Sequence, residues 1–179
     1  MPERLDAGPV VLRRGRRTDA TALAEAVGQS LDHLSPWLSW ATPPAATVAV
    51  QRARIRDARR AWRAGNDYAY LVFLPAGDRP IGGIGLHRRI GPGALEIGYW
   101  IHVDHAGQGK TTAAVRALTE AALRLADVSR LEIHCDVAND ASAAVPAKVG
   151  YRLDRIDPHP PLAPSETGHR QIWVFPPGD

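Results

Sequence analysis

The sequence predicts an α/β fold in which a mixed sheet is built around one central strand–loop–helix unit. The unit begins with Leu95–Val103, an apolar run that has the composition of a buried strand and leads through a polar loop into a helical pattern. Turn residues separate this run from two earlier strand-like segments, which predicts an antiparallel meander of three strands. Further strand and helix patterns precede and follow the meander, as expected for an α/β protein.

The expected elements follow the order strand, two helices, three strands, helix, strand, helix and two strands. The strand segments are apolar or alternating runs bounded by glycine, proline and polar residues, at 10–13, 68–74, 81–89, 95–103, 131–137, 151–156 and 170–175. Glycines at positions 82, 83 and 85 indicate close packing or a bulge in the third of these strands.

The expected helices are recognised by an apolar stripe or by residues that cap their ends. Thr18 or Asp19 can begin the first helix, which carries a buried stripe at positions 23, 27 and 31. The second is a basic helix that Gly65 can terminate, and Gly150 can terminate the last. The three later helices are expected at 47–64, 109–126 and 139–149.

Size and composition are those of one domain spanning residues 1–179. No apolar run approaches ~18 residues and the start lacks the apolar core of a signal peptide, so we expect a cytoplasmic protein without a membrane span. Cys135 is the only cysteine, which excludes an intrachain disulfide, and the histidines form no convincing metal set. The net charge of +3 is carried by arginine, because Lys110 and Lys148 are the only lysines.

The glycine loop before residue 110 predicts an anion site, because free N–H groups at a helix start favour phosphate and glycine lets a ligand approach the backbone. Gly109-Lys110-Thr111 resembles the end of a nucleotide-binding P-loop, but the first glycine of that motif would fall on Asp104. A dinucleotide fingerprint also fails, because Thr112 stands in place of its third glycine. A helix entry whose glycines serve only packing remains open from these residues alone.

The same strand and loop resemble motif A of the GNAT acyltransferase superfamily, whose pattern is Q/R-x-x-G-x-G/A. Its positions fall on Ala106, Gly109 and Thr111, so both outer positions depart from the pattern. Glu96–Trp100, EIGYW, is similar to the strand typical of the ribosomal-protein N-acetyltransferase (RimJ/RimL) branch.

Two further segments resemble that branch, one at 33–40 (HLxPWLxW) and one at 139–151 (N-x-x-S-x-x-x-x-x-K-x-G-[FY]). The resemblance covers most of the chain in the right order, and the chain is identified as a member of this superfamily. It implies the GNAT fold, a mixed and mostly antiparallel sheet of about six to seven strands flanked by helices, with splayed central strands. It also implies direct transfer of the acetyl group of acetyl-CoA to a primary amine, without a covalent enzyme intermediate.

The resemblance further implies where acetyl-CoA would bind, without a metal. The pantetheine arm would pair with the backbone of Trp100, Ile101, His102 and Val103. The pyrophosphate would be held by Gly107, Gln108, Gly109, Lys110, Thr111 and Thr112. Asn139 and Ser142 would contact the pantetheine end, and Lys148 would reach the 3′-phosphate. Both lysines could equally be ordinary solvated charges.

Glu96 is the expected general base, because a carboxylate that interrupts a buried apolar strand is unusual without a purpose. The alternative is a strand-end glutamate paired with an arginine. Many GNAT enzymes protonate the leaving thiolate with a tyrosine whose position is Pro146 here, so the resemblance gives this role to Ser142. Simple helix capping is the alternative for Asn139 and Ser142. The residues expected on the acceptor side are Trp37, Trp40, Glu96 and Tyr99.

Two other functions stay open from the sequence. Because Ala106, Thr111 and Pro146 depart from the family patterns, the chain could be an acetyl-CoA-binding sensor with little catalysis. The basic segment Arg52–Arg63 could bind nucleic acid, although the arginines are otherwise spread along the chain. The acceptor is expected to be a protein N-terminus or a small-molecule amine, and a homodimer is left open.

Overall fold

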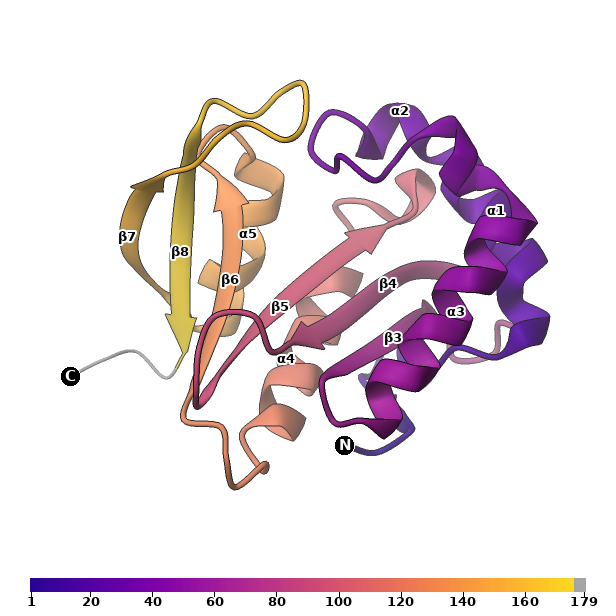
Figure 1. Cartoon of the computed structure of the whole chain (residues 1–179), viewed down its shortest axis with the longest axis horizontal. Helices are drawn as coiled ribbons and strands as arrows, with labels where there is room; N and C mark the ends of the chain where they lie inside the picture. The colour runs from indigo at the N-terminus through magenta and orange to yellow at the C-terminus, as the bar shows by residue number, and fades with distance from the viewer. Residues whose placement is uncertain (176–179) are drawn as a thin grey trace.

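Residues 1–175, which the structure describes, form one mixed sheet of eight strands in this computed structural model (Figure 1). The strands lie in the order β1-β2-β3-β4-β5-β6-β8-β7, and only β5 and β6 are parallel neighbours in this part of the chain. Their bounds are β1 Arg4–Asp6, β2 Val11–Arg14, β3 Asp67–Phe73, β4 Pro80–His87, β5 Ala94–Ile101, β6 Arg130–Asp136, β7 Arg152–Pro158 and β8 His169–Phe175.

The expected strands are all present, with small differences at their ends. The expected number of about six to seven was too low by one, because β1 is too short to show an apolar period. It is a strand because it pairs with β2, where Leu5 lies opposite Leu12.

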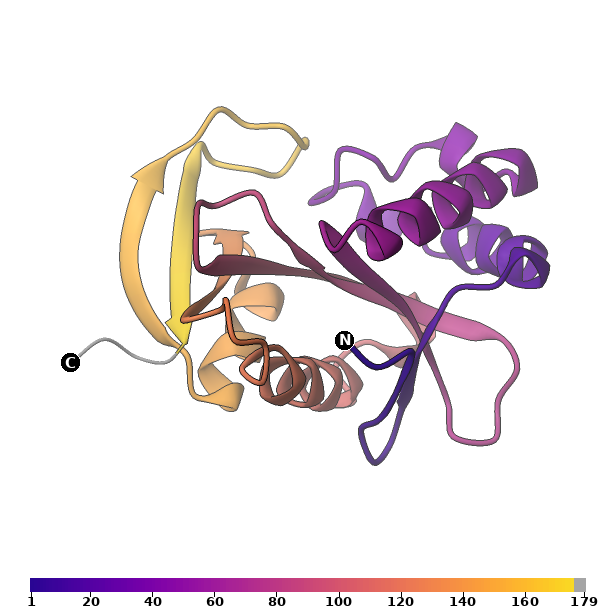
Figure 2. The same ribbon diagram turned by 60° about the horizontal axis from the view of Figure 1, so that its bottom comes forward.

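Helices cover both faces of the sheet (Figure 2). The strand β3 shows how alternation divides its side chains between the two faces. Leu71 and Phe73 pack with α1 and α3, whereas Tyr70 and Val72 belong to the core that contains α4 and α5. The helices are α1 Ala20–Gln29, α2 Leu31–Leu34, α3 Val48–Arg63, α4 Lys110–Ala122 and α5 Asp140–Val149, with short 3₁₀ turns η1 Arg17–Asp19, η2 Pro43–Ala46 and η3 Val103–His105.

Side chains cap the starts of α3 and α5, and of these two caps only Asn139 was considered from the sequence. Thr47 accepts a hydrogen bond from the backbone of Val50 at the start of α3, and Asn139 caps α5. Asp19 precedes α1, but its carboxylate is bound by both terminal nitrogens of Arg13 at 2.8 Å instead of by the helix. The segment expected as a loop at 33–40 begins with the last turn of α2, and α4 ends at Ala122, before the expected 126.

The glycines of β4 allow Trp100 of β5 to lie against the neighbouring strand. A Cβ at Gly82 would come within 2.6 Å of the Trp100 carbonyl oxygen, and one at Gly83 within 2.5 Å of the indole nitrogen. Close packing, predicted from the sequence, is therefore the reason for these glycines. Their effect is to fix Trp100 on the sheet surface that faces α1 and α3.

The central strands separate partway along their length. β5 and β6 pair only at Ala94↔Arg130, Leu95↔Leu131 and Glu96↔Glu132, and Figure 1 shows the two strands diverging beyond this point. The far edge of β6 is occupied by β8 throughout. The splayed central strands are therefore confirmed, and they leave the second half of β5 with a free edge. None of the helices within residues 1–175 is long and apolar enough to cross a membrane.

Candidate active site

Two pockets meet where β5 leaves β6. The large pocket, of about 710 Å³, is bordered by α3, the middle strands and the loop before β8. The small pocket, of about 320 Å³, lies along the glycine loop and the starts of α4 and α5. The residues that line both pockets are Trp37, Leu38, Tyr99, Trp100, Asn139 and Ser142. A molecule in one pocket can therefore meet a molecule in the other at these side chains.

The glycine loop forms an open anion cradle at the end of the small pocket. Gly107 and Gly109 adopt φ values of 70° and 73°, which are left-handed, and a Cβ at either would meet nothing within 4 Å. The backbone N–H groups from 107 to 112 have no hydrogen-bond partner among the residues that the structure describes. A row of free N–H groups at the start of a helix is the arrangement that binds a pyrophosphate.

The two lysines of the chain both line the small pocket. Lys110 donates to the side chain of Gln108, whose own amide is bound to the Asp104 carbonyl at 2.7 Å. Lys148 comes from the last turn of α5, on the other wall. Cations on both sides of a cradle of free amides fit a cofactor that carries several phosphates.

The backbone groups of His102 and Val103, which the resemblance assigns to the pantetheine arm, are hydrogen-bonded within the protein. The His102 amide donates to the Ile81 carbonyl at 2.8 Å, and the Val103 amide donates to Ser30 Oγ at 3.2 Å. Their carbonyls accept from the next turn, because the chain bends there into η3. Neither residue lines a pocket, whereas Trp100 and Ile101 line the small one, so the free edge of β5 ends at Ile101.

Ser142 is held in place through its backbone. The Asn139 side chain accepts from the Ser142 amide at 3.0 Å, so helix capping describes this contact. Pro146 lies inside α5 and has no N–H, which leaves the Ser142 carbonyl without its helical donor. The Tyr99 hydroxyl donates to that carbonyl at 3.0 Å and also lies 3.1 Å from Ser142 Oγ. Burial raises the pKa of the Tyr99 hydroxyl, which keeps it protonated as a donor.

Glu96 lies at the inner end of the large pocket and is ion-paired. Arg89 binds both of its carboxylate oxygens, at 2.7 and 2.5 Å. Burial alone would raise the pKa of the Glu96 carboxyl, but the Arg89 hydrogen bonds and the nearby charges of His134, Arg89 and His87 hold it below its usual value. The arginine pairing that the sequence left as an alternative is thus present, and it makes Glu96 a weak base.

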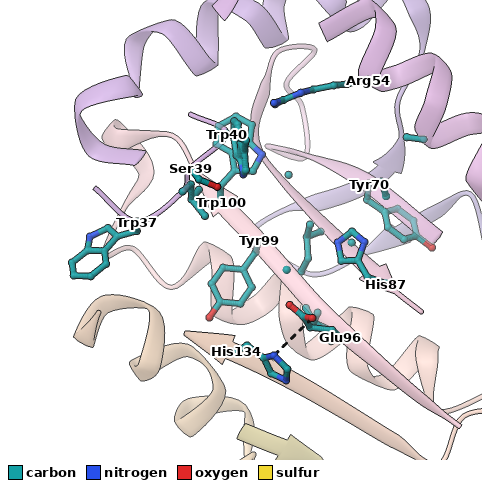
Figure 3. Close-up of a pocket in the computed structure, with 18 of the residues that line it drawn as sticks. Trp37, Ser39, Trp40, Arg54, Tyr70, His87, Glu96, Tyr99, Trp100 and His134 are labelled. Carbon is teal, nitrogen blue, oxygen red and sulfur yellow. Dashed lines mark ion pairs between the residues drawn. The ribbon is translucent and has the colours of Figure 1, made fainter. Parts of the chain in front are cut away.

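His134 of β6 faces Glu96, as Figure 3 shows, and sequence reasoning missed it. Its Nδ1 lies 3.8 Å from Glu96 Oε2, and its Nε2 lies 2.6 Å from Glu132 Oε2. The signal was visible, because Glu132, His134 and Asp136 alternate with the apolar residues of β6 and so share one face. Within residues 1–175, no group of three or more acidic, histidine or cysteine side chains is arranged to hold a metal ion.

Aromatic and basic side chains form the opposite wall of the large pocket (Figure 3). Trp40 meets Trp100 edge to face with ring centroids 6.0 Å apart, and the guanidinium of Arg54 lies 4.7 Å from the Trp40 ring centroid. Arg54 has no carboxylate or hydrogen-bond partner among the described residues, and burial lowers its pKa. Trp37 lines both pockets. The expected tryptophans therefore do border the cavity.

The loop between β7 and β8 closes the remaining side. His159, Leu162 and Glu166 of this loop line the large pocket, and the Ser165 amide donates to the Pro36 carbonyl at 2.9 Å. Asp136 anchors the loop by accepting from the amide and hydroxyl of Thr167. Cys135 also borders the pocket, but burial raises the pKa of its thiol to about 11, so it is not a thiolate nucleophile at neutral pH.

Comparison with known families decides what this arrangement is. The family model described as "Acetyltransferase (GNAT) domain" matches residues 10–152. The chain belongs to the GNAT acetyltransferase family. The predicted resemblance is confirmed, and with it the GNAT fold and the use of acetyl-CoA to acetylate an amine.

Individual proteins that are similar to this GNAT enzyme are also named as acetyltransferases. A Bacillus subtilis (strain 168) protein named "Putative ribosomal N-acetyltransferase YdaF" is 34% identical over 148 residues, which are 79% of this chain and 77% of that protein. The Escherichia coli (strain K12) ribosomal-protein-serine acetyltransferase is 34% identical over 89 residues, 49% of each chain. The solved structure of RimL, a ribosomal L7/L12 acetyltransferase, with coenzyme A has a TM-score of 0.85 at 23% identity and covers 96% of this chain and 97% of its own.

The family membership explains the cradle and supports an enzyme over a sensor. Free amides at 107–112, open space above Gly107 and Gly109, and the two lysines fit the phosphates of acetyl-CoA. The departures at Ala106 and Thr111 do not remove these amides, because a side-chain change leaves the backbone N–H groups in place. At Pro146, the Tyr99 hydroxyl replaces the missing helical donor to the Ser142 carbonyl.

The Tyr99 contact predicts a measurable coupling with Pro146. Tyr99→Phe should lower the free energy of unfolding by about 1 kcal/mol or more, because the Ser142 carbonyl loses its donor. In a Pro146→Ala background the alanine N–H can serve that carbonyl, so the same substitution should cost less. Urea unfolding of the two single variants, the double variant and the parent gives the coupling energy. Equal costs in both backgrounds would contradict the compensation.

Proposed function

We propose that this enzyme acetylates the α-amino group at the N-terminus of a protein, with a ribosomal protein as the expected substrate. The observation that carries the reaction is the junction of the two pockets at Tyr99 and Ser142, where a donor thioester and an acceptor amine would meet. The protein acceptor is supported by the names of two relatives, a putative ribosomal N-acetyltransferase and a ribosomal-protein-serine acetyltransferase. The large pocket, at about 710 Å³, has room for the first residues of a peptide. The cytoplasmic location stays a prediction.

The proposed roles on the donor side follow from the contacts. The amides at 107–112 with Lys110 and Lys148 would bind the phosphates, and the free edge of β5 at Trp100 and Ile101 would pair with the pantetheine arm. Ser142 Oγ would donate a hydrogen bond to the leaving sulfur. The Asn139 and Tyr99 contacts support this role because they fix the Ser142 backbone on both sides.

On the acceptor side, the incoming group is an ammonium ion that must lose a proton before it can attack. Glu96 is buried, with 7% of its surface exposed, and its charge is held by Arg89. A carboxylate with a lowered pKa is a weak base, but it attracts a cation well. We therefore assign to Glu96 the stabilisation of positive charge at the inner end of the pocket, in place of the simple base expected from the sequence.

Arg54 indicates what else the acceptor carries. A partly buried guanidinium without a carboxylate partner favours an anionic group in the same pocket. An N-terminal peptide with an acidic side chain close to its α-amine supplies that group. Trp40, beneath Arg54, would restrict its position by stacking.

The acceptor class can be tested with peptides. We expect the enzyme to acetylate peptides with a free α-amine and to leave the same peptides unmodified when the N-terminus is blocked and a lysine is present. The test uses a panel of such peptide pairs, free amino acids and polyamines, each incubated with acetyl-CoA. Thiol release measures the rate, and mass spectrometry locates the acetylated amine. Transfer confined to lysine side chains or to small amines would overturn the proposal that the acceptor is a protein N-terminus.

The role of Arg54 predicts a charge-dependent acceptor preference. Arg54→Gln should raise KM about 10-fold for a peptide with aspartate near its N-terminus and change it little for the asparagine analogue, because one charge-assisted contact is lost. Arg52→Gln is the matched control, since Arg52 lies on the same helix but is exposed. Equal effects of Arg54→Gln on both peptides, or equal effects of the two variants, would contradict the assignment.

A further inference from the structure

His134 forms a buried carboxylate–imidazole pair that faces the reacting end of the large pocket. Its side chain is 10% exposed, and that of Glu132 behind it is 2% exposed. Glu132 Oε2 lies 2.6 Å from His134 Nε2. The other oxygen, Oε1, is buried and accepts no hydrogen bond from a described residue, although Arg130 Nε lies 2.9 Å away as an ion pair. The contact with His134 is therefore the hydrogen bond that satisfies Glu132.

This pairing decides which ring nitrogen can accept a proton. An ionised carboxylate only accepts, so Nε2 carries the hydrogen that it shares with Glu132. In the neutral ring, Nδ1 then carries the lone pair that can accept a hydrogen bond or a proton. Nδ1 lies 3.8 Å from Glu96 Oε2 and 3.4 Å from Arg170 Nη1, on the side where the ring borders the large pocket. The contact with Arg170 is long, so an incoming amine can replace it.

We propose that His134 Nδ1 accepts the proton from the acceptor ammonium group, and that Glu132 is the positioning residue that holds the ring for this step. The proposal rests on the amine acetylation described above and names a residue of that same site. It assigns to Glu96 the stabilisation of the imidazolium that forms 3.8 Å away.

The proton balance is complete with the residues present. An N–H bond of the ammonium breaks, its electron pair stays on nitrogen, and the proton forms a new bond at His134 Nδ1. The nitrogen then forms a bond to the acetyl carbon while the carbon–sulfur bond breaks and its electron pair leaves with sulfur. The nitrogen then loses a second proton, which ends on that sulfur. Ser142 is placed to donate a hydrogen bond to the sulfur as the charge develops. His134 returns its proton to solvent, so one proton is released in each turnover.

Some of the charged groups around His134 favour a positive charge on its ring, and others oppose it. Glu96 from β5 and Glu132 from its own strand favour the imidazolium. Arg170 from β8 opposes it, and Arg170 also contacts His159 in the loop before β8. Arg89 and Arg130 partly neutralise the two glutamates. Glu132 is the nearest charged partner of the ring, at 2.6 Å, while Arg170 at 3.4 Å and Glu96 at 3.8 Å face Nδ1.

His134→Ala tests the proposal. With an N-terminal peptide at saturating acetyl-CoA, kcat should fall roughly 10²–10⁴-fold, the range expected for loss of a general base. The acidic limb of the kcat/KM profile between about pH 5 and 8 should change shape, because histidine is the side chain that normally titrates there. Added imidazole should restore part of kcat, and acetyl-CoA binding measured by calorimetry should stay as in the parent.

His87→Ala is the matched control, because His87 also borders the pocket and pairs with a carboxylate, Asp67, at 3.2 Å. Imidazole should not increase the rate of this variant or of Glu96→Ala. Glu132→Gln should move the acidic limb of the profile to lower pH, because the imidazolium loses one stabilising charge. A limb that does not move would remove Glu132 from its positioning role.

The outcomes separate this inference from the proposed function. If the parent enzyme transfers acetyl groups to no N-terminal peptide, the proposed function fails. If the parent is active, but His134→Ala keeps the parent pH profile or gains nothing from imidazole, the assignment of His134 is overturned. A loss of acetyl-CoA binding in His134→Ala would also overturn it, because a base on the acceptor side should not affect the donor.

Discussion

The parallel pairing between β5 and β6 ends at Glu96 and Glu132, and the site depends on this ending. Before that point the two strands form part of a continuous sheet; beyond it, each presents a free edge toward the other. Beyond this point the two pockets meet, and Glu96 and His134 face each other in the large pocket where the pairing ends. If the pairing continued, the pantetheine arm would have no free edge on β5 to pair with.

The donor and acceptor halves of the site use different physical means. The donor half relies on backbone N–H groups with unobstructed glycines, so it tolerates side-chain changes at Ala106 and Thr111. The acceptor half relies on charged side chains that are fixed by partners, as in the Arg89–Glu96 and Glu132–His134 contacts. Ser142 lies between the halves, where Asn139 and Tyr99 contact its backbone and the Tyr99 hydroxyl lies 3.1 Å from its Oγ.

Most of the fold could be predicted from the sequence, because the apolar period, the glycine turns and the capping residues determine helices and strands through neighbouring residues. The strand–loop–helix unit, the meander and the short helix at Asn139 are all of this kind. The strand β1 was missed because a three-residue strand exists only through its partner. The backbone of His102 and Val103 was assigned to the cofactor for a similar reason, since the turn that uses their amides depends on Ile81 and Ser30, far away in the chain.

Some residues of the candidate site could be predicted from the sequence and others could not, for the same physical reason. The glycine loop and Ser142 follow from local motifs, whereas the ion pair of Glu96 with Arg89 and the approach of His134 arise from packing between strands. Pro146 is the clearest case. The sequence shows that it removes a helical donor, but only the structure shows that the Tyr99 hydroxyl replaces it.

We propose that the freed edge of β5 and the loop amides bind acetyl-CoA as one continuous surface. Amide chemical shifts of ¹⁵N-labelled protein during titration with coenzyme A test it most directly. The account predicts the largest changes at the amides of 107–112, with further changes at Trp100 and Ile101 and small ones at His102 and Val103, whose amides are already bonded. Saturable binding that leaves the 107–112 amides unchanged would contradict it.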